Sequence, residues 1–337
     1  MKVKNIEISN PNFRPKTFTE VKEWVFTLMM GKEKTAALGD MICWMSAIKY
    51  VAEQFNFVQG HLIVPSFFME IAQNLMREYP HWRIHTKIPD RLANGFPIKA
   101  PMMHPVNATA VHLVDLGYLY FAGMMPPEGF GQYPVLDLSD LEMPPHLSEL
   151  LVIGAYAVMT PGATTKNRAM PPSVYNGICD HLLTKGITPV HIGTSQMEYR
   201  EIQPQMNAQY DFSKGINLID KTSLLEAALI MSDARMVIGI DNGLLHLAAM
   251  TDTTILFGYT VAGPRTRQIR RPHGHTIELY ADKEKLPCLF CQENVRFFMD
   301  HHFTNCIYKE NEPACIKALN VESWNASIDM ALGENNG

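Results

Sequence analysis

The sequence has no long hydrophobic run and no apolar leader. None of its apolar stretches reaches the roughly 18 residues that a membrane-spanning helix needs. Residues 1–16 are polar and lack the apolar core of a signal peptide. The first absence argues against a membrane-spanning helix. Together the two absences predict a cytoplasmic protein, in which disulfide bonds do not normally form.

Charged residues and nucleotide-binding signatures are also scarce. Charged residues make up 19% of the chain and the formal net charge is −5, which argues against a nucleic acid as the main partner. No G-x-G-x-x-G follows a predicted strand, which argues against an NAD-dependent dehydrogenase. The GK at positions 31–32 lacks the upstream spacing of a phosphate-binding P-loop. Hydrophobic residues reach 47%, as in a globular protein.

The length of 337 residues suits two domains of about 150 residues each. The order of apolar patterns predicts strands alternating with helices, which is typical of parallel sheets covered by helices. Five prolines in the stretch 126–145 indicate a linker between two such series. The first series has expected strands at Trp24–Met30 and His61–Val64, expected helices at Met41–Phe55 and Phe67–Arg77, and a further strand at Ala110–Asp115 followed by a helix from Tyr118.

The second series begins near Leu150. Pro171 and Pro172 fit the first turn of a helix, and Ser223 with Glu226 resembles a capping box. Short apolar runs bounded by turns predict strands. We expect strands at Leu151–Met159, Thr188–Ile192, Asn217–Ile219, Met236–Ile240 and Thr254–Gly258, and helices at Pro171–Lys185, Ser223–Met231, Leu244–Met250 and Ala318–Leu332.

The stretch Arg235–Thr251 carries the clearest functional signal. A strand, a sharp turn at Asp241-Asn242-Gly243 and a helix bearing His246 would point free backbone N–H groups at one place. Those amides and the positive end of the helix dipole favour an anion. The alternative is an ordinary strand–helix turn with an N-capping Asp or Asn.

Several segments together resemble glycosyltransferase family 9, the family of the ADP-heptose:lipopolysaccharide heptosyltransferases. They are Leu38-Gly39-Asp40, PGATTKNRAMP at 161–171, a strand ending in Gly193, the helix from Ser223 to Glu226, and IDNGLLHLAA at 240–249. The resemblance covers residues 25–275. It implies an α/β protein of the GT-B fold, with two Rossmann-like, doubly wound domains facing across a cleft. Residues 1–148 would be the acceptor-side domain. Residues 149–337 would bind the nucleotide sugar and end in a helix that returns to the first domain.

The resemblance also implies roles for single residues. Asp40 matches the family's catalytic aspartate, and a carboxylate there suits a base that deprotonates the acceptor hydroxyl. The alternative for Asp40 is a stabilising helix cap. Arg168 matches a basic position that neutralises the leaving diphosphate, and the family often has Lys there. The alternative for Arg168 is a solvated loop charge. Thr164 and Thr165 would contact the donor.

Four more residues are expected at the donor in the motif after residue 240. Asp241 resembles the acidic residue that contacts the sugar hydroxyls. Asn242 and Gly243 would offer backbone N–H groups, and His246 a side chain one turn further on. Glu198, five residues after Gly193, would accept the ribose hydroxyls.

Four cysteines gather in the segment 288–315 with the spacing C-x2-C-x14-C-x8-C. Cys288, Cys291, Cys306 and Cys315 predict a structural zinc site in a reduced compartment. Free or redox-linked thiols are the alternative. No cofactor is expected in catalysis.

The sequence therefore predicts an inverting, metal-independent glycosyltransferase. Its donor would be a nucleotide-diphosphate sugar similar to ADP-heptose, and its acceptor a glycan, including a lipid-linked one at the inner membrane face. The alternatives are a related transferase acting on another acceptor, such as a modified nucleic acid base, and a non-catalytic nucleotide-sugar binding protein. The basic segment Arg265–His275 keeps the first alternative open, because it contrasts with the acidic chain.

Overall fold

The computed structural model describes residues 23–29, 37–54, 59–90, 98–99, 110–163, 166–195, 209–294, 306–308 and 313–333. The chain divides into two compact units: residues 1–104 with 111–136, and residues 105–110 with 137–337. Among the helices in the described ranges, none is long and apolar enough to cross a lipid bilayer. The assignment of residues 1–148 to the acceptor and 149–337 to the donor stays a prediction.

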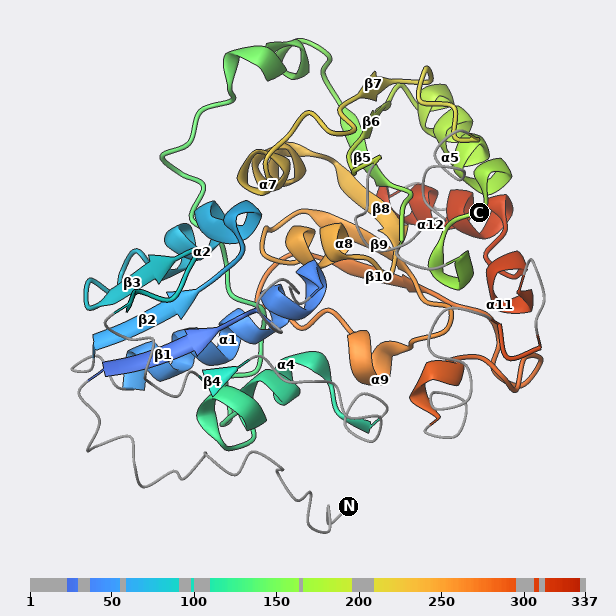
Figure 1. Cartoon of the computed structure of the whole chain (residues 1–337). Coiled ribbons are helices and arrows are strands. Elements are labelled where there is room, and N and C mark those ends of the chain that lie inside the picture. The colour runs from blue at the N-terminus through green and yellow to red at the C-terminus, as the bar shows by residue number, and fades with distance from the viewer. Residues whose placement is uncertain are drawn as a thin grey trace. The chain divides into compact units, whose positions relative to one another are not determined.

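The first unit contains a four-stranded parallel sheet with the strand order β3-β2-β1-β4 (Figure 1). Its strands are β1 (Glu23–Thr27), β2 (Gln59–Ile63), β3 (Trp82–His85) and β4 (Ile98–Lys99). Its helices are α1 (Leu38–Gln54), the 3-10 helix η2 (Ser66–Phe68), α2 (Met69–Met76), α4 (Leu113–Gly117) and the π-helical segment η4 (Tyr118–Ala122). Helix α1 connects parallel β1 to β2, so its first turn lies at the carboxyl edge of this sheet.

Aromatic side chains form the core of the first unit. The ring of Phe26 on β1 lies 5.3 Å from Trp82 and 5.8 Å from Phe121, between centroids. Trp44 of α1 is fully buried and 6.4 Å from Phe121. A Cβ atom at Gly60 would lie only 2.2 Å from the Trp82 ring. The indole therefore packs directly on the backbone of β2, which requires glycine there.

The predicted strand at Ala110–Asp115 is wrong. This segment leads into helix α4, whose N-cap residue His112 accepts a hydrogen bond from the Val114 N–H through its side chain at 3.2 Å. A short apolar run does not by itself distinguish a strand from a buried helix. The predicted helix from Tyr118 is confirmed in part, because residues 118–122 are π-helical. Strand β3 was not predicted.

The second unit contains a six-stranded parallel sheet with the order β10-β9-β8-β5-β6-β7. Its strands are β5 (Tyr156–Thr160), β6 (Thr188–His191), β7 (Ile216–Asn217), β8 (Met236–Ile240), β9 (Thr254–Gly258) and β10 (Thr276–Leu279). The chain winds outward from β5 to β7, then crosses back to β8 and winds the other way. The strand order therefore reverses between β5 and β8, and in open α/β sheets ligands bind at that point.

Helices cover both faces of the six-stranded sheet. Helices α5 (Pro172–Thr184) and α12 (Val321–Ala331) pack together on one face, and α7 (Leu224–Asp233) and α8 (Gly243–Ala248) on the other (Figure 1). Asp329 of α12 contacts two residues at the end of α5: its Oδ1 lies 2.8 Å from His181 Nε2 and 3.0 Å from Lys185 Nζ. The predicted C-terminal helix is thereby confirmed as an element, and its return to the first domain stays a prediction.

In the second unit, the predicted start of α7 is correct, whereas the predicted start of β5 is too early. The capping box is confirmed: Ser223 N–H donates to Glu226 at 2.7 Å, and Glu226 N–H donates to the Ser223 hydroxyl at 3.3 Å. The predicted strand at Leu151–Met159 begins only at Tyr156. Residues 145–151 form a 3-10 helix, and Gly154 has a φ of 75°, which no strand adopts. Strand β10 was not predicted.

Candidate functional site

Asn242 joins the two strands that flank the reversal in strand order. Its side-chain Nδ2 donates to the carbonyl oxygens of Thr160, at 3.0 Å, and Gly162, at 2.9 Å. Its Oδ1 accepts hydrogen bonds from the N–H groups of Leu244 and Leu245, both at 3.0 Å, and so caps α8. The alternative prediction of a capping Asx residue therefore holds for Asn242, and the same side chain fixes the loop that follows β5.

Asp241, directly after β8, is surrounded by basic side chains. Arg168 Nη1 lies 2.9 Å from Asp241 Oδ2, and His246 Nε2 lies 3.4 Å from Oδ1. Arg267 Nε lies 4.0 Å from Oδ2. Asp241 and His246 are each only 2% exposed, and Arg267 is 7% exposed. The predicted residues Arg168, Asp241, Asn242 and His246 are thus brought together from segments more than 70 residues apart.

The charges around Asp241 keep it ionised. Burial on its own raises the pKa of this carboxyl, but Arg168, His246 and Arg267 outweigh burial and lower the pKa far below its usual range. Among the described side chains within 4.0 Å of Asp241, two guanidinium groups and His246 face this one carboxylate. Guanidinium groups held in a buried cluster are suited to contact an anion.

Backbone amides add to this positive potential. The N–H groups of Leu244 and Leu245 are used by the Asn242 side chain. Those of Asn242 and Gly243 make no hydrogen bond to another described residue. The expectation that Asn242 and Gly243 contribute backbone N–H groups is therefore compatible with the geometry and stays a prediction.

Arg267 is a member of the Asp241 cluster that the sequence analysis did not predict. It lies in α9 (Pro264–Arg267), inside the basic segment Arg265–His275. Within that segment, Arg265 Nε is 3.2 Å from Glu293, and Arg271 donates to the Thr251 carbonyl at 3.1 Å. Basic composition indicated the segment, but only tertiary contacts distinguish the arginine that approaches Asp241 from those with structural partners.

The remaining predicted site residues are not part of the Asp241 cluster as described. Thr164, Thr165 and Glu198 lie outside the described residues. Asp241 was expected to contact sugar hydroxyls, yet Arg168 and His246 already contact its two oxygens. Asp40 belongs to the other unit, in the first turn of α1 at the carboxyl edge of the four-stranded sheet, and it is half-buried.

The four cysteines of segment 288–315 influence one another. Burial, followed by the charges of Cys291, Cys288 and Cys306, raises the pKa of Cys315 to about 12. Burial, followed by Cys288 and Cys306, raises the pKa of Cys291 to about 11. Across the described ranges, no three His, Cys, Asp or Glu side chains are arranged to hold a metal ion. The four thiols are near enough to influence one another's charge, and none of them is in a disulfide bond.

The part of the chain that contains the Asp241 cluster matches a known protein family. Residues 129–293 match the model of glycosyltransferase family 9 (heptosyltransferase). The matched residues include Arg168, Asp241, His246 and Arg267. The family match confirms the predicted resemblance and makes the chain a glycosyltransferase.

Solved structures agree on the fold. The iron-containing dodecameric glycosyltransferase TibC from enterotoxigenic E. coli H10407 superposes with a TM-score of 0.69 at 16% identity, over 94% of this chain and 80% of TibC. A family 9 glycosyl transferase from Veillonella parvula gives 0.59 at 14% identity, over 93% and 98%. E. coli ADP-heptose LPS heptosyltransferase II gives 0.57 at 13% identity, over 83% and 98%. The predicted GT-B fold class is confirmed. No curated protein is significantly similar in sequence.

Proposed function

We propose that this glycosyltransferase moves a heptose-like sugar from a nucleoside diphosphate donor, such as ADP-heptose, to a hydroxyl of a glycan acceptor. The main support for this proposal is the buried Asp241 carboxylate, which lies among Arg168, Arg267 and His246 where the strand order reverses. E. coli heptosyltransferase II, which has the same fold, is named for ADP-heptose. A lipid-linked acceptor belongs to the same proposal.

The cluster suits the departure of a nucleoside diphosphate. As the glycosidic bond breaks, negative charge develops on the diphosphate, and preorganised cations and amides stabilise that charge without rearranging. Asp241 accepts a hydrogen bond from Arg168 Nη1 and so fixes the position of this guanidinium charge near the proposed diphosphate. This arrangement supplies positive charge from side chains, so the proposed chemical step needs no metal.

Asp40 supplies the proposed base. A carboxylate at the carboxyl edge of the first unit accepts the proton of the acceptor hydroxyl as its oxygen attacks the anomeric carbon. One direct displacement of the diphosphate then inverts the configuration at that carbon. The proposal assigns the acceptor to the first unit and the nucleotide sugar to the second.

Nucleotide binding tests the donor assignment. We expect ADP to raise the melting temperature of the wild-type protein more than UDP or GDP does, because binding to the native state stabilises it by mass action. Arg168→Ala should abolish most of this rise. Arg265→Ala is the matched control, since Arg265 lies in the neighbouring basic segment but pairs with Glu293.

Three results would count against the donor assignment. An equal rise in Arg168→Ala and wild type would remove Arg168 from the donor site. A preference for UDP or GDP would exclude an ADP-sugar donor, and no rise with any nucleotide would refute a nucleotide site at Asp241.

We also propose that Cys288, Cys291, Cys306 and Cys315 hold a structural metal ion. Four thiolates suit zinc or iron, and TibC, which has the same fold, is described as iron-containing. Metal analysis of protein purified without chelator should find about one zinc or iron per chain, lost in Cys291→Ser. A metal content unaffected by that substitution, or none at all, would exclude the site.

A further inference from the structure

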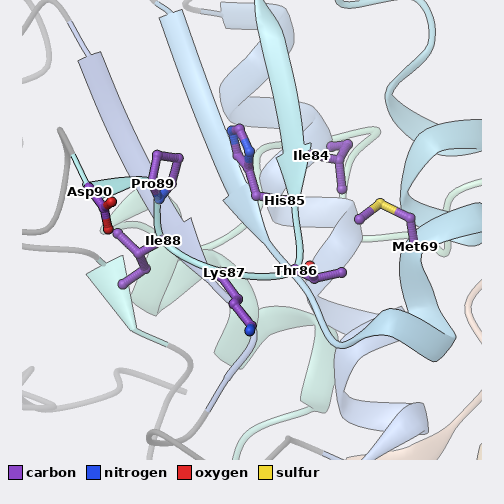
Figure 2. Close-up of a pocket in the computed structure, with 8 residues that line it drawn as sticks. All are labelled: Met69, Ile84, His85, Thr86, Lys87, Ile88, Pro89 and Asp90. Carbon is purple, nitrogen blue, oxygen red and sulfur yellow. The ribbon is translucent and has the colours of Figure 1, made fainter.

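A pocket of about 530 Å³ lies in the first unit, at the carboxyl end of β3. Met69 and residues 84–90 line it, and Figure 2 shows His85 between Met69 on one side and Asp90 on the other. The buried His61 fixes this histidine, because its Nδ1 lies 3.0 Å from His85 Nε2. The proposed function assigns the acceptor to this unit, so the pocket falls within that assignment. A polar arrangement in the second unit has no role in it.

Glu293 in the second unit carries a carboxylate that is largely removed from solvent, with a side chain only 11% exposed. Its Oε1 accepts hydrogen bonds from the Gly263 N–H and from the Thr266 hydroxyl, both at 3.1 Å. Its Oε2 lies 3.2 Å from Arg265 Nε. Both carboxylate oxygens therefore contact α9 or its N-cap residue, Gly263.

These contacts fix the helix that carries Arg267. The Thr266 carbonyl accepts a hydrogen bond from Arg267 Nη1 at 3.2 Å, and Arg267 Nε lies 4.0 Å from Asp241 Oδ2. Helix α9 has only four residues, so contacts outside the helix determine its position more than its own hydrogen bonds do. Thr266 thus links the Glu293 carboxylate to one arginine of the Asp241 cluster.

The turn that precedes Glu293 also binds the loop between β9 and α9. The Phe290 N–H donates to the Thr260 carbonyl at 3.2 Å. The Thr260 hydroxyl in turn donates to the carbonyl of Asn167, the residue before Arg168, at 2.9 Å. The same loop therefore connects to the segments of both arginines that face Asp241, and the turn ending in Glu293 supports it from outside the cluster.

We propose that Glu293 is a positioning residue of the donor site, which holds Arg267 beside Asp241 and thereby raises the affinity for a nucleoside diphosphate. The inference rests on the proposed function, and it adds a residue that acts through Arg267 and not by contact with the donor. A cation that is held in place before the donor binds loses little freedom on binding. Without Glu293, α9 would be free to move and Arg267 would lose its fixed position.

A double-mutant cycle on the full chain, measured by calorimetric titration with ADP, tests this role. Arg267→Ala should weaken ADP binding by a factor of about ten or more, the usual effect of losing a charged hydrogen-bond donor. Glu293→Ala should weaken it by a factor of about ten. Because the two residues act in series, Glu293→Ala/Arg267→Ala should bind ADP no more than about twofold more weakly than Arg267→Ala.

Three further variants separate positioning from a general loss of structure. Glu293→Gln keeps an acceptor oxygen for Gly263 and Thr266, so its ADP affinity should stay within about threefold of wild type. Arg265→Ala is the matched control with wild-type affinity, since Arg265 is exposed and contacts the other carboxylate oxygen. If Glu293→Ala does not fold, Thr266→Val removes one donor to the carboxylate and should weaken ADP binding about threefold. Melting temperatures without ligand report on the fold of each variant.

The outcomes distinguish this inference from the donor assignment. Wild-type affinity in Glu293→Ala, or losses that add up in the double variant, would overturn the positioning role. A loss of ADP binding in Arg168→Ala with normal binding in Glu293→Ala would reject the role of Glu293 and keep the proposed function. Absence of ADP binding by the wild-type protein would reject the donor assignment, and this inference with it.

Discussion

Asp40→Asn should lower kcat by a factor of about 10² to 10⁴ while leaving the affinity for ADP unchanged. Positioned general bases contribute rate accelerations of this size, and an amide does not accept the proton of the acceptor hydroxyl. The substitution keeps the size of the side chain in the first turn of α1. Loss of the charge at this helix end costs about 0.3–1 kcal/mol of stability, which is too little to unfold the protein. Steady-state kinetics and calorimetric titration with ADP measure the two quantities.

A carboxylate at the other end of the same helix provides the control. Glu53 accepts a hydrogen bond from the Tyr79 hydroxyl at 2.8 Å, within the first unit. Glu53→Gln should therefore leave kcat within a few-fold of wild type. If Asp40→Asn retained full turnover, the base would be another residue, and Asp40 would be a helix cap. If the variant lost ADP binding as well as turnover, Asp40 would act through the fold or the donor site.

Asp241→Ala should destabilise the second unit by roughly 3–5 kcal/mol, the usual cost of removing one partner from a buried ion pair. Arg168 and Arg267 would then face each other's charge without their carboxylate, in a site where Asp241 is only 2% exposed. Chemical denaturation, followed by fluorescence, measures the change in the free energy of unfolding. Donor affinity should fall as well, because the guanidinium of Arg168 would lose its orientation.

The control for Asp241 is an exposed ion pair in the same unit. Asp282 lies 3.6 Å from Lys285 with a side chain that is 49% exposed, and Asp282→Ala should cost less than about 1 kcal/mol. Equal losses in the two variants would show that the Asp241 cluster contributes no more than a surface pair. That result would also remove the argument that the cluster is a preorganised site.

The pKa of Asp241 sets the pH range of this effect. A carboxyl whose pKa is lowered in the folded state contributes stability above the pKa of the unfolded chain, and loses it as the pH falls through the folded value. Because the pKa of Asp241 lies far below its usual range, its contribution is fully present at neutral pH. Titration of the Asp241 carboxyl itself should therefore add no pH dependence to stability between about pH 5 and pH 8.

Local patterns in the sequence determined much of the secondary structure. The apolar run Met236–Ile240 is the strand β8, the Asx-Gly turn begins α8, and the Ser223–Glu226 capping box begins α7. These signals succeed because they depend on contacts within a few residues. The apolar runs at 110–115 and 151–155 were wrongly predicted as strands, since an apolar run alone does not distinguish a strand from a helix. At 110–115 the His112 cap begins a helix, and before β5 the left-handed conformation of Gly154 interrupts the strand.

The sequence by itself determined the two series of strands and helices, the family, and the turn at Asp241-Asn242-Gly243. Only the tertiary structure decided which side chains meet there. Arg168 precedes Asp241 by 73 residues and Arg267 follows it by 26, and neither separation carries a local signal. The pocket around His85 also follows from tertiary structure, because β3 pairs with β2 and places His85 against His61. Residue patterns report the periodicity of single elements, whereas a site is formed by side chains that the sheet order brings together.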